Sequence, residues 1–181
     1  MKYQVYKPNS KNSGCAASFQ MVEDKKKEGT IMFLNMIQQA SWNDASKTGS
    51  FSPNVGNPEK SCAVMFNLTE CGEMIAAFNY RTPKNFYHKT ESRTVSITLS
   101  PWDKTGKIRT KDGEQEYPVN AFGLKVTIDG AKIFSLPLEP GEIENIKALI
   151  TQGMMRNYGK VEEYAKRLEV ADDVKEDTVS Q

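Results

Sequence analysis

Alternating apolar and polar side chains mark the clearest strand of the chain, between residues 93 and 100. Val95, Ile97 and Leu99 fall on one side of an extended backbone, and the threonines and serines between them fall on the other. Such alternation predicts a strand with one covered face and one open face. Less regular apolar runs predict further strands at residues 3–7, 15–22, 30–40, 61–68, 85–89, 121–128 and 132–136.

Two other segments have apolar residues at helical spacing. The first helix is predicted from Thr69, as its N-cap, to about Phe78, and the second from Glu142 to about Asn157. The order is therefore four strands, a helix, four strands and a helix. It predicts an α+β fold of two antiparallel four-stranded sheets, each followed by a helix (ββββα-ββββα), in one domain over residues 1–158.

Two long polar segments, residues 41–60 and 101–118, contain glycine and proline and are predicted as loops. A loop of this length inside a compact domain is usually functional. Tight turns are predicted at Asp112-Gly113 and, joining the last two strands as a hairpin, at Asp129-Gly130.

Composition excludes two broad classes of protein. Hydrophobic residues make up 38% and charged residues 26% of the 181 residues, which is enough apolar material for a core and argues against a largely disordered chain. No run approaches the ~18 apolar residues of a membrane-spanning helix, and the first residues do not resemble a secretory leader. We expect a cytoplasmic protein, of bacterial or viral-in-host context.

The sequence offers little catalytic or metal-binding chemistry. It has one histidine, no CxxC pair, no P-loop and no GxSxG motif, and its acids fall mostly in turns, helix starts and the C-terminal segment. We therefore expect no enzymatic activity, no metal and no cofactor. The three cysteines, Cys15, Cys62 and Cys71, are predicted to be small buried thiols.

Charge is distributed unevenly along the chain. Residues 81–111 hold eight basic and two acidic side chains, whereas residues 159–181 hold four basic and seven acidic ones. We predict that residues 159–169 extend the last helix and that 171–181 are disordered, so that 159–181 form an acidic, mobile tail. Such a tail can compete with phosphate for the basic region, dock partner proteins, or simply keep the chain soluble.

Several strings, in order, resemble the Whirly family of single-stranded nucleic-acid-binding proteins over residues 3–158. The best match is the strand–helix junction of residues 60–75, KSCAVMFNLTECGEMI. Further matches are NFYH at 85–88, the strand that ends at Pro101, and FSLPL at 134–138. At the N-terminus, VYK and AASF resemble the family's Tyr-Lys-Gly-Lys-Ala-Ala-Leu stretch, split here by residues 8–15.

The resemblance implies sequence-tolerant binding of single-stranded DNA in replication, recombination or repair, by a homotetramer whose helices pack together. One departure affects the site. The family's Tyr-Asp-Trp segment before the fourth strand is replaced by the polar segment 41–60, in which Trp42 is the candidate substitute.

Binding of single strands needs cations along the phosphates and flat rings on which bases stack. Both occur here in the same regions. The candidate binding residues are Lys7, Lys11, Lys25, Lys27, Trp42, Lys60, Tyr80, Arg81, Lys84, Phe86, Tyr87, His88, Lys89 and Arg93. Further rings at polar or loop positions are stacking candidates, namely Tyr3, Tyr6, Phe19, Phe51 and Trp102, whereas Phe33, Phe66 and Phe134 are predicted to lie in the core.

Two other functions remain open at this stage. The same fold would suit an RNA-binding or RNA-annealing protein or a transcription cofactor, and the sequence does not separate DNA from RNA. Alternatively, the sheets bury their outer faces against partner chains and bind no nucleic acid. An oligomer interface is predicted on the last helix. The helix has more apolar surface than packing against one small sheet requires, so part of that surface is expected to contact another chain. The residues proposed for it are Ile143, Ile146, Ile150 and Met154.

Overall fold

Two four-stranded antiparallel sheets form the body of the protein, as predicted. The computed structural model describes residues 1–24, 29–111 and 113–179. The first sheet has the order β1-β2-β3-β6 and the second the order β10-β9-β8-β7. The strands of the first sheet are β1 (Lys2–Lys7), β2 (Cys15–Asp24), β3 (Gly29–Gln38) and β6 (Ser61–Phe66). Those of the second are β7 (Lys84–Lys89), β8 (Thr94–Thr110), β9 (Gly113–Ile128) and β10 (Lys132–Leu138).

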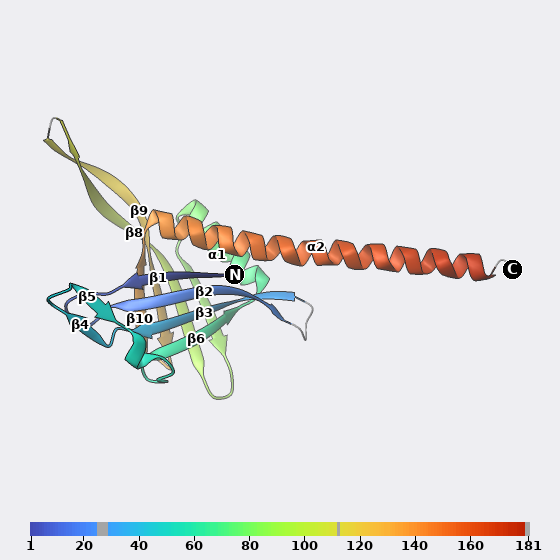
Figure 1. Cartoon of the computed structure of the whole chain (residues 1–181), viewed down its shortest axis with the longest axis horizontal. Helices are drawn as coiled ribbons and strands as arrows, with labels where there is room; N and C mark the ends of the chain where they lie inside the picture. Colours follow the sequence, from blue (N-terminus) through green and yellow to red (C-terminus); the bar gives the residue numbers. More distant parts are fainter. Residues whose placement is uncertain (25–28, 112, 180–181) are drawn as a thin grey trace.

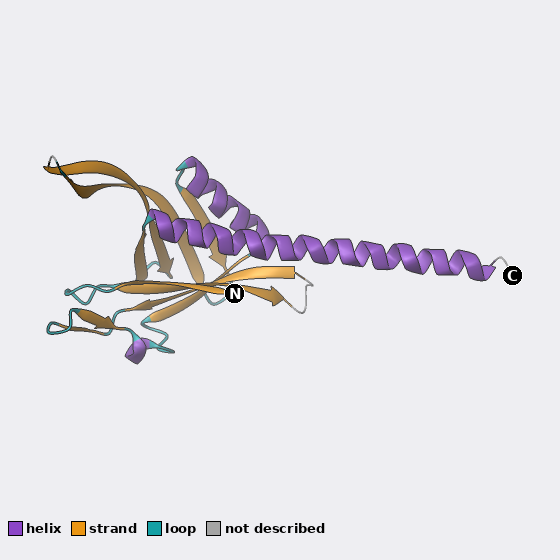
Figure 2. Cartoon of the chain, turned by 45° about the horizontal axis from the view of Figure 1, so that its top comes forward, coloured by secondary structure: helices purple, strands orange, loops and turns teal. Residues whose placement is uncertain are grey.

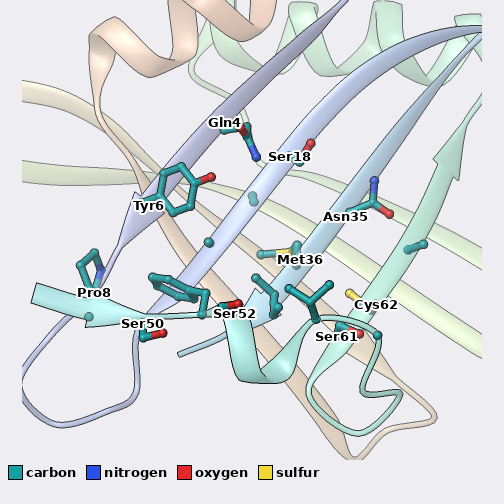
Figure 3. Close-up of a pocket in the computed structure, with 18 of the residues that line it drawn as sticks. Gln4, Tyr6, Pro8, Ser18, Asn35, Met36, Ser50, Ser52, Ser61 and Cys62 are labelled. Carbon is teal, nitrogen blue, oxygen red and sulfur yellow. The ribbon is translucent and has the colours of Figure 1, made fainter. Parts of the chain in front are cut away.

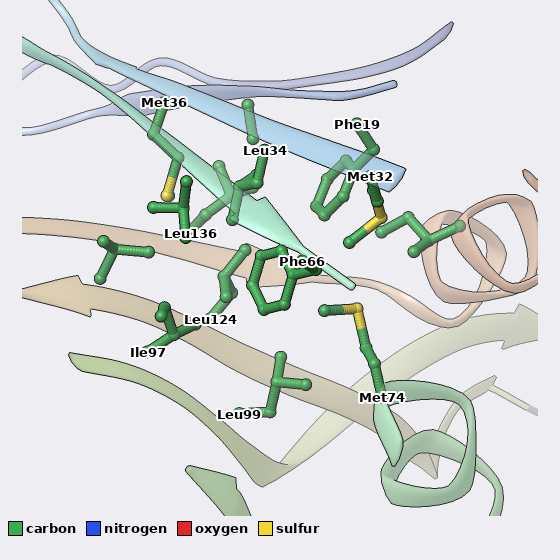
Figure 4. Close-up of a cluster of buried hydrophobic side chains, with 14 of the residues drawn as sticks. Phe19, Met32, Leu34, Met36, Phe66, Met74, Ile97, Leu99, Leu124 and Leu136 are labelled. Atoms are coloured by element: carbon green, nitrogen blue, oxygen red, sulfur yellow. The ribbon is translucent and has the colours of Figure 1, made fainter. Parts of the chain in front are cut away.

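The core lies between the inner faces of the two sheets, whose strands cross one another (Figure 1). Figure 4 shows Leu34 of the first sheet and Leu124 of the second in the same buried cluster, with Met74 from the helix that follows β6 along the chain. In β3 the inward residues are Met32, Leu34 and Met36, so Phe33 lies half-buried on the outer face and not in the core as predicted. Phe66 and Phe134 are buried, as predicted.

The first helix, α1 (Leu68–Tyr80), is capped by Asn67 and not by Thr69 as predicted. The Asn67 side chain accepts from the Glu70 backbone N–H at 2.9 Å, and the Glu70 carboxylate accepts from the Asn67 N–H at 3.0 Å. This reciprocal capping box starts the helix two residues earlier. Arg81 ends it in the left-handed conformation.

The second helix, α2 (Pro140–Val179), is much longer than predicted and projects beyond both sheets (Figure 2). Its backbone is helical over residues 171–179, which were predicted to be disordered, whereas residues 180–181 lie outside the described part. No glycine or proline occurs after Gly159 to break the helix, and residues 160–170 are rich in helix-forming Glu, Ala, Lys, Arg and Leu. Whether this segment is mobile in solution stays a prediction.

The first turns of α2 correct the predicted oligomer interface. Ile143, Ile146 and Ile150 are 5%, 0% and 0% exposed, because α2 packs on β1, β2 and β3 of its own chain. Met154 is half-buried against the same core. The three isoleucines are already covered within the monomer and are not available to a partner chain, whereas Met154 is covered only in part and stays a candidate for the interface. Among the described residues no helix is both long and apolar enough to cross a membrane.

The predicted loop over residues 101–118 is instead an extended hairpin. β8 and β9 stay in register out to the pair Thr110–Gly113, and the arm they form projects away from the sheets (Figure 1). Gly113 has a positive φ of 120°, which favours glycine, as predicted for this turn; Asp112 lies outside the described residues. The arm contains residues that favour strands, which explains why β8 and β9 continue so far. These residues are Trp102, Ile108, Tyr117 and Val119.

Residues 41–60, called the excursion below, also contain more structure than a loop. They hold the short hairpin of β4 (Ser41–Asn43) and β5 (Thr48–Ser50) and the single turn η1 (Ser52–Asn54). Gln39, 5% exposed, anchors them: its amide donates to the carbonyls of Asn9 and Ser41, both at 2.9 Å. The excursion is therefore held beside the end of β1.

Candidate functional site

The outer face of the first sheet is hollow because small side chains form its centre. Two cross-strand rows define this face. The first is Gln4–Ser18–Asn35–Ala63 and the second is Tyr6–Ala16–Ile37–Ser61, each with one residue from β1, β2, β3 and β6. Alanine and serine rise little above the backbone, so a depression follows these rows across the sheet.

The excursion encloses this depression and turns it into a cavity of about 1240 Å³. The sheet forms its floor, and residues 47–52, 55, 56 and 58 of the excursion form one wall. A further side comes from the second sheet, at Arg93, Ile128, Asp129 and Lys132. Figure 3 shows Gln4, Ser18 and Asn35 on neighbouring strands, with Tyr6 on the edge strand β1, Pro8 just after that strand, and Ser50 and Ser52 on the excursion.

An aromatic pair stands at one end of the cavity. The rings of Tyr6 and Phe51 meet edge to face, with centroids 5.9 Å apart and planes at 62°. Tyr6 is 55% exposed, so one face of its ring is open to a ligand. Offset and edge contacts of this kind hold a ring in place and leave its other surface for stacking.

Positive charge predominates around the cavity. The lining includes Lys2, Lys47, Arg93 and Lys132 but one carboxylate, that of Asp129. Lys132 is paired with Glu59 at 2.6 Å, and Lys47 lies 3.6 Å from Asp44. Within the described residues, Lys2 and Arg93 have no carboxylate within ion-pair distance, so both are available to an anion.

The Asp129 carboxylate is engaged in hydrogen bonds with Thr94 and is not free to contact a ligand. Its carboxylate accepts from the Thr94 backbone N–H at 2.7 Å and from the Thr94 hydroxyl at 3.2 Å. The backbone hydrogen bond from Thr94 is the main reason that the pKa of Asp129 is lowered, and the nearby charges of Arg93 and Lys132 lower it further. Asp129 therefore stays ionised and fixes the turn that carries Arg93 and Lys132.

Two lining residues hold polar atoms that have no partner in the described structure. Ser18 Oγ and Arg93 Nε are shielded from solvent and make no hydrogen bond. A buried polar atom without a partner costs roughly 1–3 kcal/mol, so such atoms are uncommon unless something else satisfies them. Both lie at a cavity that can hold a polar ligand.

The cysteines offer no nucleophile to this cavity. Burial raises the pKa of the Cys62 thiol, which lines it, to about 11, and that of Cys15 to about 12. Burial raises the pKa of Cys71, on the buried face of α1, to about 12 as well. All three are buried free thiols, as predicted, and stay protonated near neutral pH.

A second set of predicted residues lies on the outer face of the second sheet. Tyr87 is 65% exposed and begins the cross-strand row Tyr87–Ser96–Thr127–Ile133. Lys89 is exposed on the same strand, two residues on and thus on the same face. Arg93, one of the predicted cations, lies in the turn between β7 and β8 and lines the cavity. This turn therefore connects the outer face of the second sheet with the cavity on the first sheet.

Four predicted binding residues make contacts that support the fold. Lys7 pairs with Glu142 at 2.7 Å, and both side chains are only 25% and 21% exposed. Lys84 pairs with Glu73 at 2.9 Å and lies over the Phe86 ring, which is itself in the core. His88 Nε2 lies 2.6 Å from Glu70 Oε1. Of the additional stacking candidates, Phe19 is 1% exposed and belongs to the core.

The remaining predicted residues lie away from the cavity lining. Lys11 and Lys60 are exposed in loops. Trp42 is half-buried in β4, where its Nε1 donates to Asp44 at 3.1 Å. Tyr80 is exposed at the end of α1, next to Arg81, which pairs with Asp103 at 2.7 Å. Lys25 and Lys27 lie outside the described residues.

The polar floor of the cavity was not predicted from the sequence. Gln4, Ser18 and Asn35 belong to three strands that were correctly predicted, and each sits at an outward position of its strand. The available signal was the alternation of Gln4 with Val5 and of Asn35 with Leu34. It shows which face is open, but not that the excursion covers it.

Comparison with known proteins gives a likeness of structure alone. No protein-family model and no curated protein sequence matches the chain. The fold matches the crystal structure of WHY1 from Arabidopsis thaliana with a TM-score of 0.56 and 12% identity, over 94% of this chain and 92% of that one. WHY3 from Arabidopsis thaliana matches with a TM-score of 0.55 and 12% identity, over 94% and 95%.

A third structure, described as the plant transcriptional regulator PBF-2, matches with a TM-score of 0.53 and 12% identity, over 91% of this chain and 87% of that one. The chain therefore has the Whirly fold, as its sequence strings indicated, and is at most distantly related to these proteins.

Proposed function

We propose that the protein binds single-stranded DNA along the outer faces of its two sheets, tolerates many sequences, and acts in DNA replication, recombination or repair. One observation carries the proposal. The cavity on the first sheet places an open aromatic ring, Tyr6, beside a polar floor and unpaired cations, Lys2 and Arg93. A nucleotide is the common ligand that needs a stacking surface, hydrogen-bonding groups and a cation together.

The depth of the cavity favours single strands over duplex. A duplex turns its bases inward and pairs their edges, so a cavity lined by Tyr6, Ser18 and Asn35 can meet a base only when that base is unpaired. Each base stacked on an exposed ring contributes roughly 1–3 kcal/mol, so two or three such contacts decide the affinity. Tyr87 and Lys89 on the second sheet supply a second place for a ring and a phosphate.

The Whirly fold adds support of a general kind, because proteins of that fold bind single-stranded nucleic acids. We further propose that the protein is a homotetramer, as the resemblance implies. Since Ile143, Ile146 and Ile150 are buried within the monomer, other surfaces must form the contacts between chains; Met155 on α2, 68% exposed, is one candidate.

The test is a competition experiment with single-stranded DNA, duplex DNA and single-stranded RNA of equal length and sequence, at several salt concentrations. We expect single-stranded DNA to compete best and its affinity to fall steeply as salt rises. Equal competition by duplex would overturn the proposal, and preference for RNA would transfer it to the alternative of RNA binding or annealing on the same surfaces.

A second candidate function is that of an assembly protein that binds no nucleic acid. The arm formed by β8 and β9 favours it, because Trp102, Ile108 and Tyr117 are 44%, 55% and 48% exposed there. Apolar side chains on an arm with unpaired edges are suited to cover by another chain. Absence of binding to any single strand, together with a stable oligomer in light scattering, would support this alternative.

A further inference from the structure

We infer that the cavity takes up one unstacked base and recognises its hydrogen-bonding edge, so that binding has a base preference at one position. This inference rests on the proposed function and refines it, because a surface that only stacks bases and pairs with phosphates does not contact the hydrogen-bonding edges of the bases. The group recognised is a planar, uncharged heterocycle that carries both donors and acceptors, attached to a phosphate.

The shape of the cavity fits an inserted ring better than a strand lying flat. Its floor has small side chains at Ala16, Ser18 and Ala63, which leave room above the sheet. The excursion rises beside this floor, held by Gln39 and by the close approach of Gly49 to Pro8. A strand that passes over the sheet can therefore place one base below the level of the excursion.

The polar groups on the floor match a base edge. Gln4, Ser18 and Asn35 lie in one cross-strand row and, within the described residues, none of their side chains makes a hydrogen bond. Each primary amide has donors and an acceptor, and the hydroxyl has both. A base edge presents donors and acceptors in an order that differs between bases, so a fixed row of partners prefers one order.

The cations around the cavity are positioned to bind the phosphates of the nucleotide whose base is inserted. Arg93 stands at the side formed by the second sheet and Lys2 lines the cavity from β1, whereas Lys132, beside Arg93, is held by Glu59. Tyr6 and Phe51 lie at the end near Pro8. A base between the aromatic pair and the polar row leaves its phosphates at the cationic rim. A neutral or cationic peptide would make no use of this excess of positive charge.

The test measures affinity for dT, dA and dC homopolymers of equal length with the wild type and with three variants. Ser18→Ala and Asn35→Ala each remove polar partners, and Ala63→Trp fills the cavity from an exposed position. Thr151→Ala and Asn79→Ala, at exposed positions on α2 and α1, are the matched controls. Thermal unfolding of every variant shows whether the fold is kept.

We expect the strongest and weakest homopolymers to differ by about five- to tenfold for the wild type, the size of one or two hydrogen bonds to a base. Ser18→Ala, Asn35→Ala and Ala63→Trp should each reduce this ratio, and the controls should not. The support for the inference is the change of this ratio in the variants, and not the preference of the wild type. Differences in stacking between bases can give the wild type a preference without any contact to the polar floor.

Three outcomes count against the inference, and they can be told apart. Equal affinity of the wild type for all homopolymers overturns base recognition and leaves the proposed function standing. An unchanged ratio in all three variants shows that any preference arises elsewhere. Failure of the wild type to bind any single strand overturns the proposed function itself, and the inference with it.

Discussion

The ring of Phe51 meets the ring of Tyr6 edge to face, at 5.9 Å between centroids, although 45 residues separate them in the sequence. Tyr6 belongs to the edge strand of the first sheet, whereas Phe51 belongs to the excursion between the third and fourth strands of that sheet. Their contact closes one end of the cavity, and it makes the position of Tyr6 depend on a segment that the alternation of apolar residues does not predict as structured.

Tyr6→Ala should weaken binding of single-stranded DNA by about five- to 150-fold, because one base stack contributes roughly 1–3 kcal/mol. The slope of affinity against salt should change little, since no cation is removed. Fluorescence anisotropy at four salt concentrations measures both quantities. Tyr158→Ala, which removes a tyrosine exposed on α2, is the control; an equal loss in both variants would argue against stacking at Tyr6.

Lys7→Ala should lower the free energy of unfolding and have little effect on the affinity for single-stranded DNA. The Lys7 ammonium lies 2.7 Å from Glu142 Oε1, while Glu142 Oε2 accepts from the Glu139 N–H at 2.8 Å at the start of α2. Loss of this partly buried pair should lower the free energy of unfolding by about 1 kcal/mol, or the melting temperature by about 2–4 °C. Lys11→Ala, in an exposed loop, should leave the melting temperature unchanged.

The contribution of Asp129 to stability should depend on pH. Its pKa is lowered in the folded state, so the ionised form stabilises the fold at neutral pH, and this stabilisation is lost as pH falls through the folded-state pKa. We expect Asp129→Asn to melt below the wild type at pH 7, and the difference to shrink as the pH falls below about 4. A difference that stays constant from pH 7 to pH 3 would contradict this account.

The cysteines should resist alkylation while the protein is folded. Since burial raises the pKa of Cys15, Cys62 and Cys71 to about 12, 11 and 12, the thiolate is scarce at pH 8 and the sulfur is covered. Mass spectrometry after treatment with iodoacetamide should find almost no adduct on the native protein and three adducts after denaturation. Rapid modification of Cys62 in the native state would contradict this expectation and show that reagents reach its sulfur through the cavity.

The acidic C-terminal segment should compete with phosphate for the basic surface. Cutting the chain after Val170 should tighten single-strand binding at low salt, and the gain should fade as salt rises, because charge interactions are screened beyond about 8–10 Å at physiological ionic strength. A full-length variant with Asp172, Asp173, Glu176 and Asp177 changed to the amides separates charge from length. Identical binding by all three proteins at every salt concentration would leave partner docking or solubility as the role of this segment.

Local patterns in the sequence determined the order of elements and most of the sheet faces. The alternation of Val95, Ile97 and Leu99 gave the inner face of β8, and Asp129-Gly130 gave the hairpin that pairs Ile128 with Lys132. Such features depend on neighbours within a few residues, so the sequence alone contains them. The same reasoning placed the end of α1 within two residues but missed its Asn67 cap and the full lengths of β8 and α2.

Only the tertiary structure decided which side chains meet at the cavity. Lys7 and Arg93 look alike in the sequence, as single cations beside predicted strands. Folding brings Glu142 to Lys7, whereas Arg93 reaches a cavity made by strands 30 or more residues away. Likewise Ser18 is an ordinary outward residue of β2 until the excursion encloses it. The lining could not be predicted from the sequence for a physical reason. Segments distant in sequence set the partners, the burial and the electrostatic environment of a side chain, and local propensity carries no information about those segments.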